Sequence, residues 1–183
     1  QIKKYHRTKP LSGVVLTIPS DALIADDREL TIKKANLIAS ELHKLSSTVC
    51  MNLPCKVVIT KCDCIVGFRE YFSSFSDEMR EQVLGLDLST VDGFYDEELF
   101  YNSWSNFIER LKSGAVSLLS SREVTDKSYS SENRLDSTAY IFSFPEHMNY
   151  LKHALEIYLK TIFERTGSFK PNLIEGVYFI SAT

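Results

Sequence analysis

The stretch KVVITKCD, residues 56–63, is the part of this sequence that most clearly sets its expected fold. Its first five residues form a short apolar run rich in β-branched side chains, which is typical of a buried strand. Lys61, Cys62 and Asp63 follow directly, so the strand is expected to end in a loop with an ammonium group and a carboxylate. Because α/β proteins bind ligands at the carboxyl ends of their strands, this loop is the first candidate site.

Similar apolar runs predict three further strands, at residues 13–18, 139–144 and 176–181. The runs are nearly continuous rather than alternating, as in the strands of a parallel sheet that is covered on both faces. Between them, apolar residues recur at steps of three and four, which predicts amphipathic helices. These patterns lie at residues 35–49, 100–118 and 148–162.

Short signals at the helix starts support these helices. Asp26 or Asp27 is placed to cap the first helix, since an Asp side chain accepts hydrogen bonds from the free N–H groups of a helix start. Pro145 is expected near the first turn of the last helix, where its missing N–H would have no partner anyway.

The alternation of strands and helices predicts an α/β fold, in which a single domain contains a three-layer, mostly parallel sheet. Residues 68–121 are expected to form a largely helical insert. The polar, Ser-rich residues 122–138 are expected to form a surface loop. The basic and polar residues 1–10 look like a linker or a cut end.

The sequence Thr60-Lys61-Cys62-Asp63 matches the [NT]KxD motif with which GTPases read guanine. A carboxylate accepts hydrogen bonds from N1 and N2 of guanine, and the aliphatic part of a Lys side chain can lie along the purine face. Another predicted strand ends in Ser181-Ala182, where GTPases offer a backbone N–H to the guanine O6. The candidate base-binding residues are Thr60, Lys61, Asp63, Ser181 and Ala182. An ordinary polar strand end is the alternative.

No phosphate-binding loop occurs in the sequence. The pattern GxxxxGK[ST] needs a glycine followed by Lys, and none of the seven glycines has one. The DxxG pattern that senses magnesium and the γ-phosphate does not occur either. We therefore expect no catalytic residue, no metal and no cofactor in this chain, and no GTP hydrolysis by it.

Composition argues against several other functions. The net charge of −3 disfavours nucleic-acid binding, which usually needs a basic face. No apolar run approaches the roughly 20 residues that span a bilayer. The spacing of Cys50, Cys55, Cys62 and Cys64 differs from the paired CxxC units of zinc sites, so free thiols are expected, with a metal site or a disulfide as the alternative. The scattered histidines are not expected to act as bases or ligands.

Longer blocks resemble one bacterial family, the IcmF/TssM proteins. Residues 60–72, TKCDCIVGFREYF, resemble the TKxDxxxGFxEyF stretch of that family, and residues 10–18, PLSGVVLTI, resemble its PINGV-type strand. Residues 76–85, SDEMREQVLG, 141–151, IFSFPEHMNYL, and 174–183, IEGVYFISAT, resemble its SxEEReQvwG-like, FPxqfxxL and RGVYFTSAT segments. The blocks run in the family's order along nearly the whole chain.

The resemblance implies part of a type VI secretion system, or of the related type IV apparatus. It implies a partial P-loop GTPase-like domain on the cytoplasmic side of a protein that is anchored in the bacterial inner membrane. The implied partners are other secretion subunits, in the membrane complex and the baseplate, and no nucleic acid. The family's phosphate loop, where present, lies upstream of the strand at residues 13–18, so GTP is implied as a ligand of a full-length parent only.

Two functions follow as hypotheses. The first is a scaffold and docking domain whose helical insert contacts other subunits, with Tyr71, Phe72 and Tyr95 as candidates for the docking face. Burial in the core is the alternative for each of these aromatic residues. The second is a GTP-dependent switch in the full-length parent, in which Asp63 reads guanine. An unrelated α/β enzyme is a third reading, but the sequence shows no recognisable nucleophile, base or metal set for it.

Overall fold

The computed structural model describes residues 11–73, 75, 83–125, 131–164 and 172–181. The expected linker, residues 1–10, lies outside this described part. The helices and strands follow one another in this order: β1 Val14–Pro19, α2 Ser20–Ala25, α3 Arg28–Val49, β2 Pro54–Thr60, the 3-10 turn η1 Cys62–Cys64, α4 Phe68–Ser73, β3 Gly85–Asp87, α6 Glu97–Thr125, α7 Ser131–Phe163 and β4 Leu173–Phe179.

The strands form one sheet in the order β1-β2-β4-β3. β1 pairs with β2, and β2 with β4, in parallel, while β3 runs antiparallel to β4 at one edge. The register places Ile18 beside Ile59 and Ile59 beside Phe179, so the three parallel strands end at the same edge. The expected α/β class with a mostly parallel sheet is confirmed.

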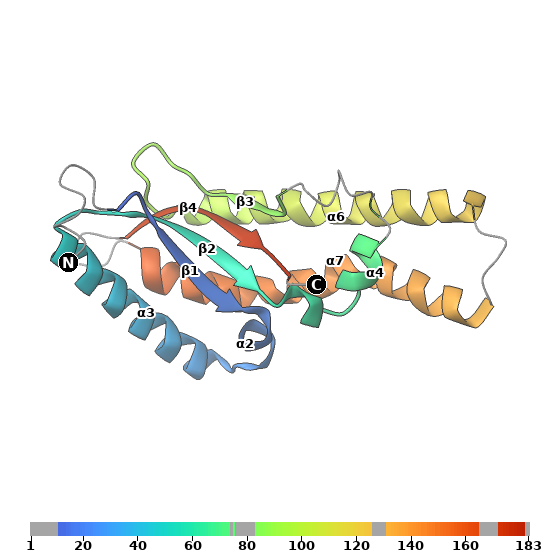
Figure 1. Cartoon of the computed structure of the whole chain (residues 1–183), viewed down its shortest axis with the longest axis horizontal. Helices are drawn as coiled ribbons and strands as arrows, with labels where there is room; N and C mark the ends of the chain where they lie inside the picture. The colour runs from blue at the N-terminus through green and yellow to red at the C-terminus, as the bar shows by residue number, and fades with distance from the viewer. Residues whose placement is uncertain (1–10, 74, 76–82, 126–130, 165–171, 182–183) are drawn as a thin grey trace.

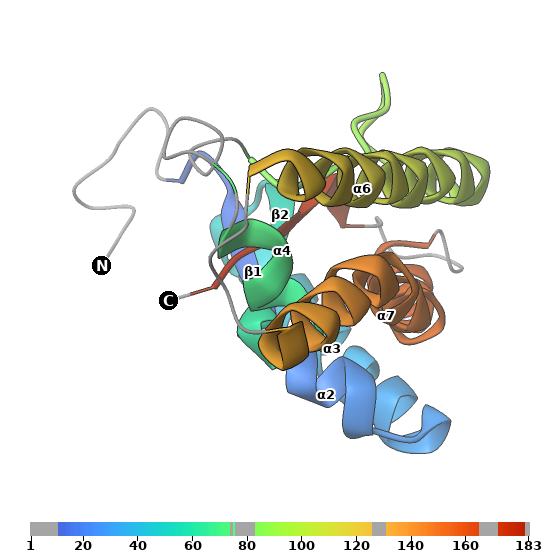
Figure 2. The ribbon, with the colours of Figure 1, turned by 90° about the vertical axis from the view of Figure 1, so that its right-hand side faces the viewer.

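Helices cover one face of this sheet. Figures 1 and 2 show α3, α6 and α7 on that face. The chain moves from β1 to β2 to β4 in one direction, and right-handed crossovers then place every connecting helix on the same side. On the other face, the described residues place no helix, and Val15 is 64% exposed beside the exposed Lys56. The described part therefore has two layers, one fewer than expected.

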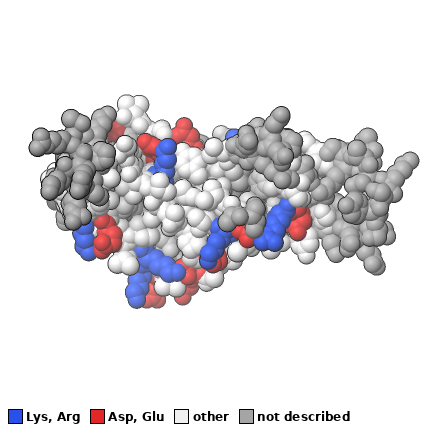
Figure 3. Space-filling view, in the orientation of Figure 1, with Lys and Arg blue, Asp and Glu red and all other residues white. Residues whose placement is uncertain are grey.

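Figure 3 views the molecule from the side of this open sheet face. Few charged side chains lie over its centre. One of the charge pairs on this side is Lys56 of β2 with Glu175 of β4, at 3.5 Å. The face is therefore largely uncharged although water reaches it.

α6 and α7 form a long hairpin whose connected end extends past the sheet (Figure 1). The Tyr101 hydroxyl on α6 donates a hydrogen bond to Glu156 on α7 at 2.8 Å. Trp104 donates from its indole N–H to the Asn149 side chain at 2.9 Å. These bonds between the two helices satisfy polar groups beside the apolar core.

The core lies between the sheet and this hairpin. Phe107 of α6 stacks on Phe179 of β4, with ring centroids 5.3 Å apart and planes 9° apart. Trp104 lies 6.2 Å from the same Phe179 ring. Both phenylalanines are at most 4% exposed, and burying each stabilises the fold by about 2 kcal/mol.

The expected strand at residues 139–144 is wrong, because this segment lies within α7. Ile141, Phe144 and Met148 are all fully buried, and their spacing of three and four residues continues the apolar stripe of the helix. Pro145 lies inside the helix rather than in its first turn, and it is buried. Its ring lacks the N–H that would bond to the Ile141 carbonyl, a loss that the packing of this buried stripe offsets.

Most of the expected loop at residues 122–138 is also helical. α6 continues to Thr125 and α7 begins at Ser131, while residues 126–130 lie outside the described part. The expected insert contains α4, most of α6 and the short strand β3, which the sequence did not indicate because three residues are too few for a period. Residues 74 and 76–82 of the insert also lie outside the described part.

Candidate functional site

The candidate site forms where β1, β2 and β4 end together. Ser20 follows β1, Lys61 follows β2, and Ile180 and Ser181 follow β4. The Ser20 hydroxyl donates a hydrogen bond to the Lys61 carbonyl oxygen at 2.7 Å. The N–H of Cys62 donates to the Ile180 carbonyl oxygen at 3.2 Å. The loop after β2 is thus held by residues from both neighbouring strands.

Lys61 has a left-handed backbone conformation, with φ 57° and ψ 35°. A residue with a Cβ adopts this conformation only at an energetic cost. The Lys61 carbonyl oxygen is held by the fully buried Ser20 and by the Cys64 N–H, which donates to it at 3.0 Å. Strained backbone of this kind concentrates at functional loops, so the conformation supports the choice of this loop as a candidate site.

Asp63 connects the two halves of the predicted site. Ser181 donates a hydrogen bond from its hydroxyl to Oδ1 of Asp63 at 2.9 Å, and Arg69 of α4 donates to Oδ2 at 3.1 Å. Both bonds favour the ionised form, so they hold the pKa of Asp63 below its usual value, and the bond from Ser181 is the larger cause. Each oxygen of this carboxylate therefore has a partner within the chain.

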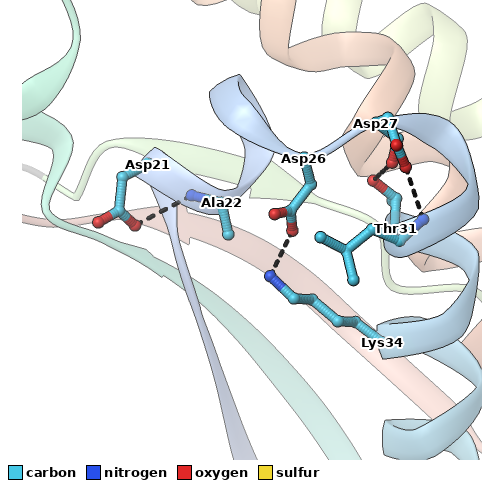
Figure 4. Close-up of polar contacts among 7 residues, drawn as sticks. Asp21, Ala22, Asp26, Asp27, Thr31 and Lys34 are labelled. Carbon is cyan, nitrogen blue, oxygen red and sulfur yellow. Dashed lines mark hydrogen bonds and ion pairs between the residues drawn. The ribbon is translucent and has the colours of Figure 1, made fainter.

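The ammonium group of Lys61 is paired with Asp21 in the first turn of α2, with Nζ 2.7 Å from Oδ2. This hydrogen bond raises the pKa of Lys61 and lowers the pKa of Asp21. The other carboxylate oxygen of Asp21 accepts from the Ala22 N–H at 3.0 Å (Figure 4). The Lys61 head group is thus bound to α2 at the edge of the site.

The turn between α2 and α3 is fixed by its own polar contacts (Figure 4). Asp27 caps α3 by accepting a hydrogen bond from the Leu30 N–H at 2.8 Å, which settles the choice between Asp26 and Asp27. Thr31 donates from its hydroxyl to the Asp27 carbonyl oxygen at 2.7 Å, and Lys34 pairs with Asp26 at 2.5 Å. These contacts hold the short helix that carries Asp21.

The two remaining predicted site residues are Thr60 and Ala182. Thr60 is the half-buried last residue of β2 and lies opposite Pro19 of β1. Ala182 lies outside the described residues.

Arg69 is a site residue that the motif did not indicate. The sequence does place a positively charged residue six positions after Asp63, but this spacing alone does not show that a turn brings the two side chains together.

The three aromatic candidates for a docking face differ in exposure. Tyr71 is only 3% exposed, and its hydroxyl donates to the Leu111 carbonyl oxygen on α6 at 3.0 Å. Phe72 and Tyr95 are half-buried. The hydroxyl oxygen of Tyr95 is buried without a hydrogen-bond partner. Tyr71 therefore belongs to the core.

The cysteines are free thiols, of which Cys50 and Cys64 are exposed and Cys55 and Cys62 are buried. Burial raises the pKa of Cys55 to about 11 and that of Cys62 to about 12, so both are protonated at neutral pH and pack as small apolar groups. In the described part of the chain, no three His, Cys, Asp or Glu side chains are placed to hold a metal ion. In the same part, no helix is long and apolar enough to cross a membrane.

Comparisons with known proteins agree on one family. The family model for the IcmF-related N-terminal domain matches residues 1–183. The type VI secretion system component TssM1 of Pseudomonas aeruginosa is 27% identical over 186 residues, which cover all of this chain and 16% of that protein. No solved structure matches. Because the family model covers the chain from its first residue to its last, the chain belongs to the IcmF-related N-terminal domain family.

Proposed function

We propose that this chain is a docking domain of a type VI secretion protein, and that it acts by binding other subunits rather than by catalysis. The similarity to TssM1 supports this, because that protein is a type VI secretion component. In the proposal, the domain lies on the cytoplasmic side of an inner-membrane protein. Its partners are subunits of the membrane complex and the baseplate.

The observation that carries the proposal is a pocket in the insert, with a cavity volume of about 190 Å³ and a lining that is about half polar and half apolar. It lies between α4, β3 and α6 and is lined by Tyr71, Phe72, Phe75, Val83, Leu84, Gly85, Phe107, Arg110 and Leu111. Val83 is 77% exposed, and Arg110 adds an exposed guanidinium group. The partner that fits has one large apolar side chain for the pocket and a neighbouring carboxylate for Arg110.

Two exposed valines allow a matched test in the full-length parent. Val83→Asp places a charge at the pocket, whereas Val116→Asp places one on α6, at a residue that does not line it. We expect Val83→Asp to reduce co-purification of the other secretion subunits and effector export at least tenfold, and Val116→Asp to leave both unchanged. Normal assembly with Val83→Asp, at normal levels of the protein, would reject the pocket as the docking site.

A GTP-dependent switch in the full-length parent is the second candidate. The contact between Asp63 and Ser181 favours it, because it joins the base-reading loop after β2 to the turn after β4. The left-handed Lys61 adds to this support. The phosphates would be held by a part of the parent that this chain does not contain, since none of its glycines is followed by Lys.

The direct test of the switch is calorimetry on the full-length parent with GTP and ATP. We expect Asp63→Asn to weaken GTP binding at least tenfold and to reduce the preference for GTP over ATP, because an amide cannot accept both guanine N–H bonds. Unchanged GTP affinity in the variant would remove the assigned role of Asp63.

A further inference from the structure

The contact between Arg69 and Asp63 resembles the contact that a guanine base would make. Arg69 places an N–H donor 3.1 Å from Oδ2 of Asp63. A guanidinium group presents adjacent N–H donors in one plane, and this is also what the N1 and N2 edge of guanine presents. Adenine lacks this pair of donors. Arg69 therefore offers the Asp63 carboxylate N–H donors of the kind that guanine would offer.

We propose that Arg69 is a built-in occupant of the base-reading carboxylate, so that guanine reaches Asp63 only by displacing the Arg69 side chain. This inference rests on the guanine-reading switch proposed above. It adds a residue that the motif does not contain and that tunes the affinity of the site. The ligand class is a guanine nucleotide.

The geometry allows this exchange without unfolding. The Arg69 side chain is 64% exposed and can rotate into water, whereas that of Asp63 is 21% exposed and stays bound to Ser181. The helix that carries Arg69 is held by other residues. The ring centroids of Phe68 and Tyr71 lie 5.9 Å and 4.8 Å from the ring centroid of the buried Phe144. Displacement therefore needs a side-chain rotation and leaves α4 in place.

The test compares Arg69→Gln with Arg28→Gln, a matched loss of one exposed arginine, since the ion pair on Asp63 comes from Arg69. The protein is the whole chain, titrated with guanosine 5′-monophosphate and, separately, adenosine 5′-monophosphate, and followed by amide chemical shifts. We expect Arg69→Gln to bind the guanine nucleotide about two- to fivefold more tightly than wild type, because an exposed ion pair competes only weakly. The affinity for the adenine nucleotide should not rise in either variant, and the affinity of Arg28→Gln for the guanine nucleotide should stay at the wild-type value.

The sign of the effect is diagnostic. Losing a positive charge ordinarily weakens binding of an anionic nucleotide, so tighter binding has to come from release of Asp63. If Arg69→Gln binds the guanine nucleotide as wild type does, or more weakly, the competition is refuted while the guanine site stands. If no protein shifts with the guanine nucleotide more than with the adenine nucleotide, the guanine site and the competition both fall.

Discussion

The Tyr71 hydroxyl of α4 donates a buried hydrogen bond to the Leu111 carbonyl oxygen of α6, 3.0 Å away and 40 residues further along the chain. Gly114 leaves room for that hydroxyl, since a Cβ at this glycine would lie 2.1 Å from the Tyr71 oxygen. α4 follows the loop of Asp63 closely in the chain. This contact therefore ties α4, whose Arg69 bonds to Asp63, to α6 within the insert.

We expect Gly114→Ala to destabilise the protein by about 1–2 kcal/mol, because overpacking outweighs the better helix propensity of alanine. In a Tyr71→Phe background the clashing oxygen is gone, and the same substitution should be close to neutral or stabilising. Urea unfolding followed by circular dichroism measures both free energies. An equal cost in the two backgrounds would show that the hydroxyl is not what excludes the Cβ.

We expect Cys50→Gly to raise the free energy of unfolding by about 1 kcal/mol. Cys50 ends α3 with a left-handed conformation at φ 58°, which glycine adopts without strain. Cys50→Ala is the control, because it also removes the thiol but keeps a Cβ. Thermal unfolding of the three proteins distinguishes the two effects, and a similar gain from both variants would contradict the backbone explanation.

We expect Ser181→Ala to raise the pKa of Asp63 toward its ordinary value, since the hydroxyl is the larger cause of the lowered pKa. With a lowered folded pKa, the stability that Asp63 contributes is present above the unfolded value of about 4 and is lost as pH falls through the folded value. The variant should therefore lose less stability than wild type on acidification from about pH 6 to about pH 2. Carboxyl chemical shifts and urea unfolding against pH measure both quantities, and an unchanged Asp63 titration would contradict the prediction.

We expect two thiols to react readily and two to resist in the folded protein. Cys50 and Cys64 are exposed, whereas Cys55 and Cys62 are buried and protonated because burial raises their pKa values to about 11 and about 12. Alkylation with iodoacetamide, located by mass spectrometry, should label the first pair at least a hundredfold faster. In urea all four thiols should react at similar rates, whereas equal rates for all four in the native protein would be incompatible with this burial.

Local sequence patterns correctly predicted the features that depend on residues close together in the chain, such as helical stripes and helix caps. The helical stripes at residues 35–49 and 100–118 lie within α3 and α6, and Asp27 caps α3 as its position suggested. The predicted strand at residues 139–144 was wrong because a mostly apolar run of six residues is too short to distinguish a buried strand from a buried helix. Phe68 and Tyr71 of α4 pack against Phe144 of α7, and this tertiary packing favours the helix.

The sequence by itself determined that Thr60, Lys61 and Asp63 follow a buried strand, because an apolar run and the polar residues after it are adjacent in the chain. It also determined the family, through blocks that lie between residues 10 and 183, and the family model matches residues 1–183. Only the tertiary structure decided that Ser181 and Arg69 share the carboxylate of Asp63. Ser181 comes 118 residues later, and such contacts depend on strand order and crossover direction, which no local pattern encodes.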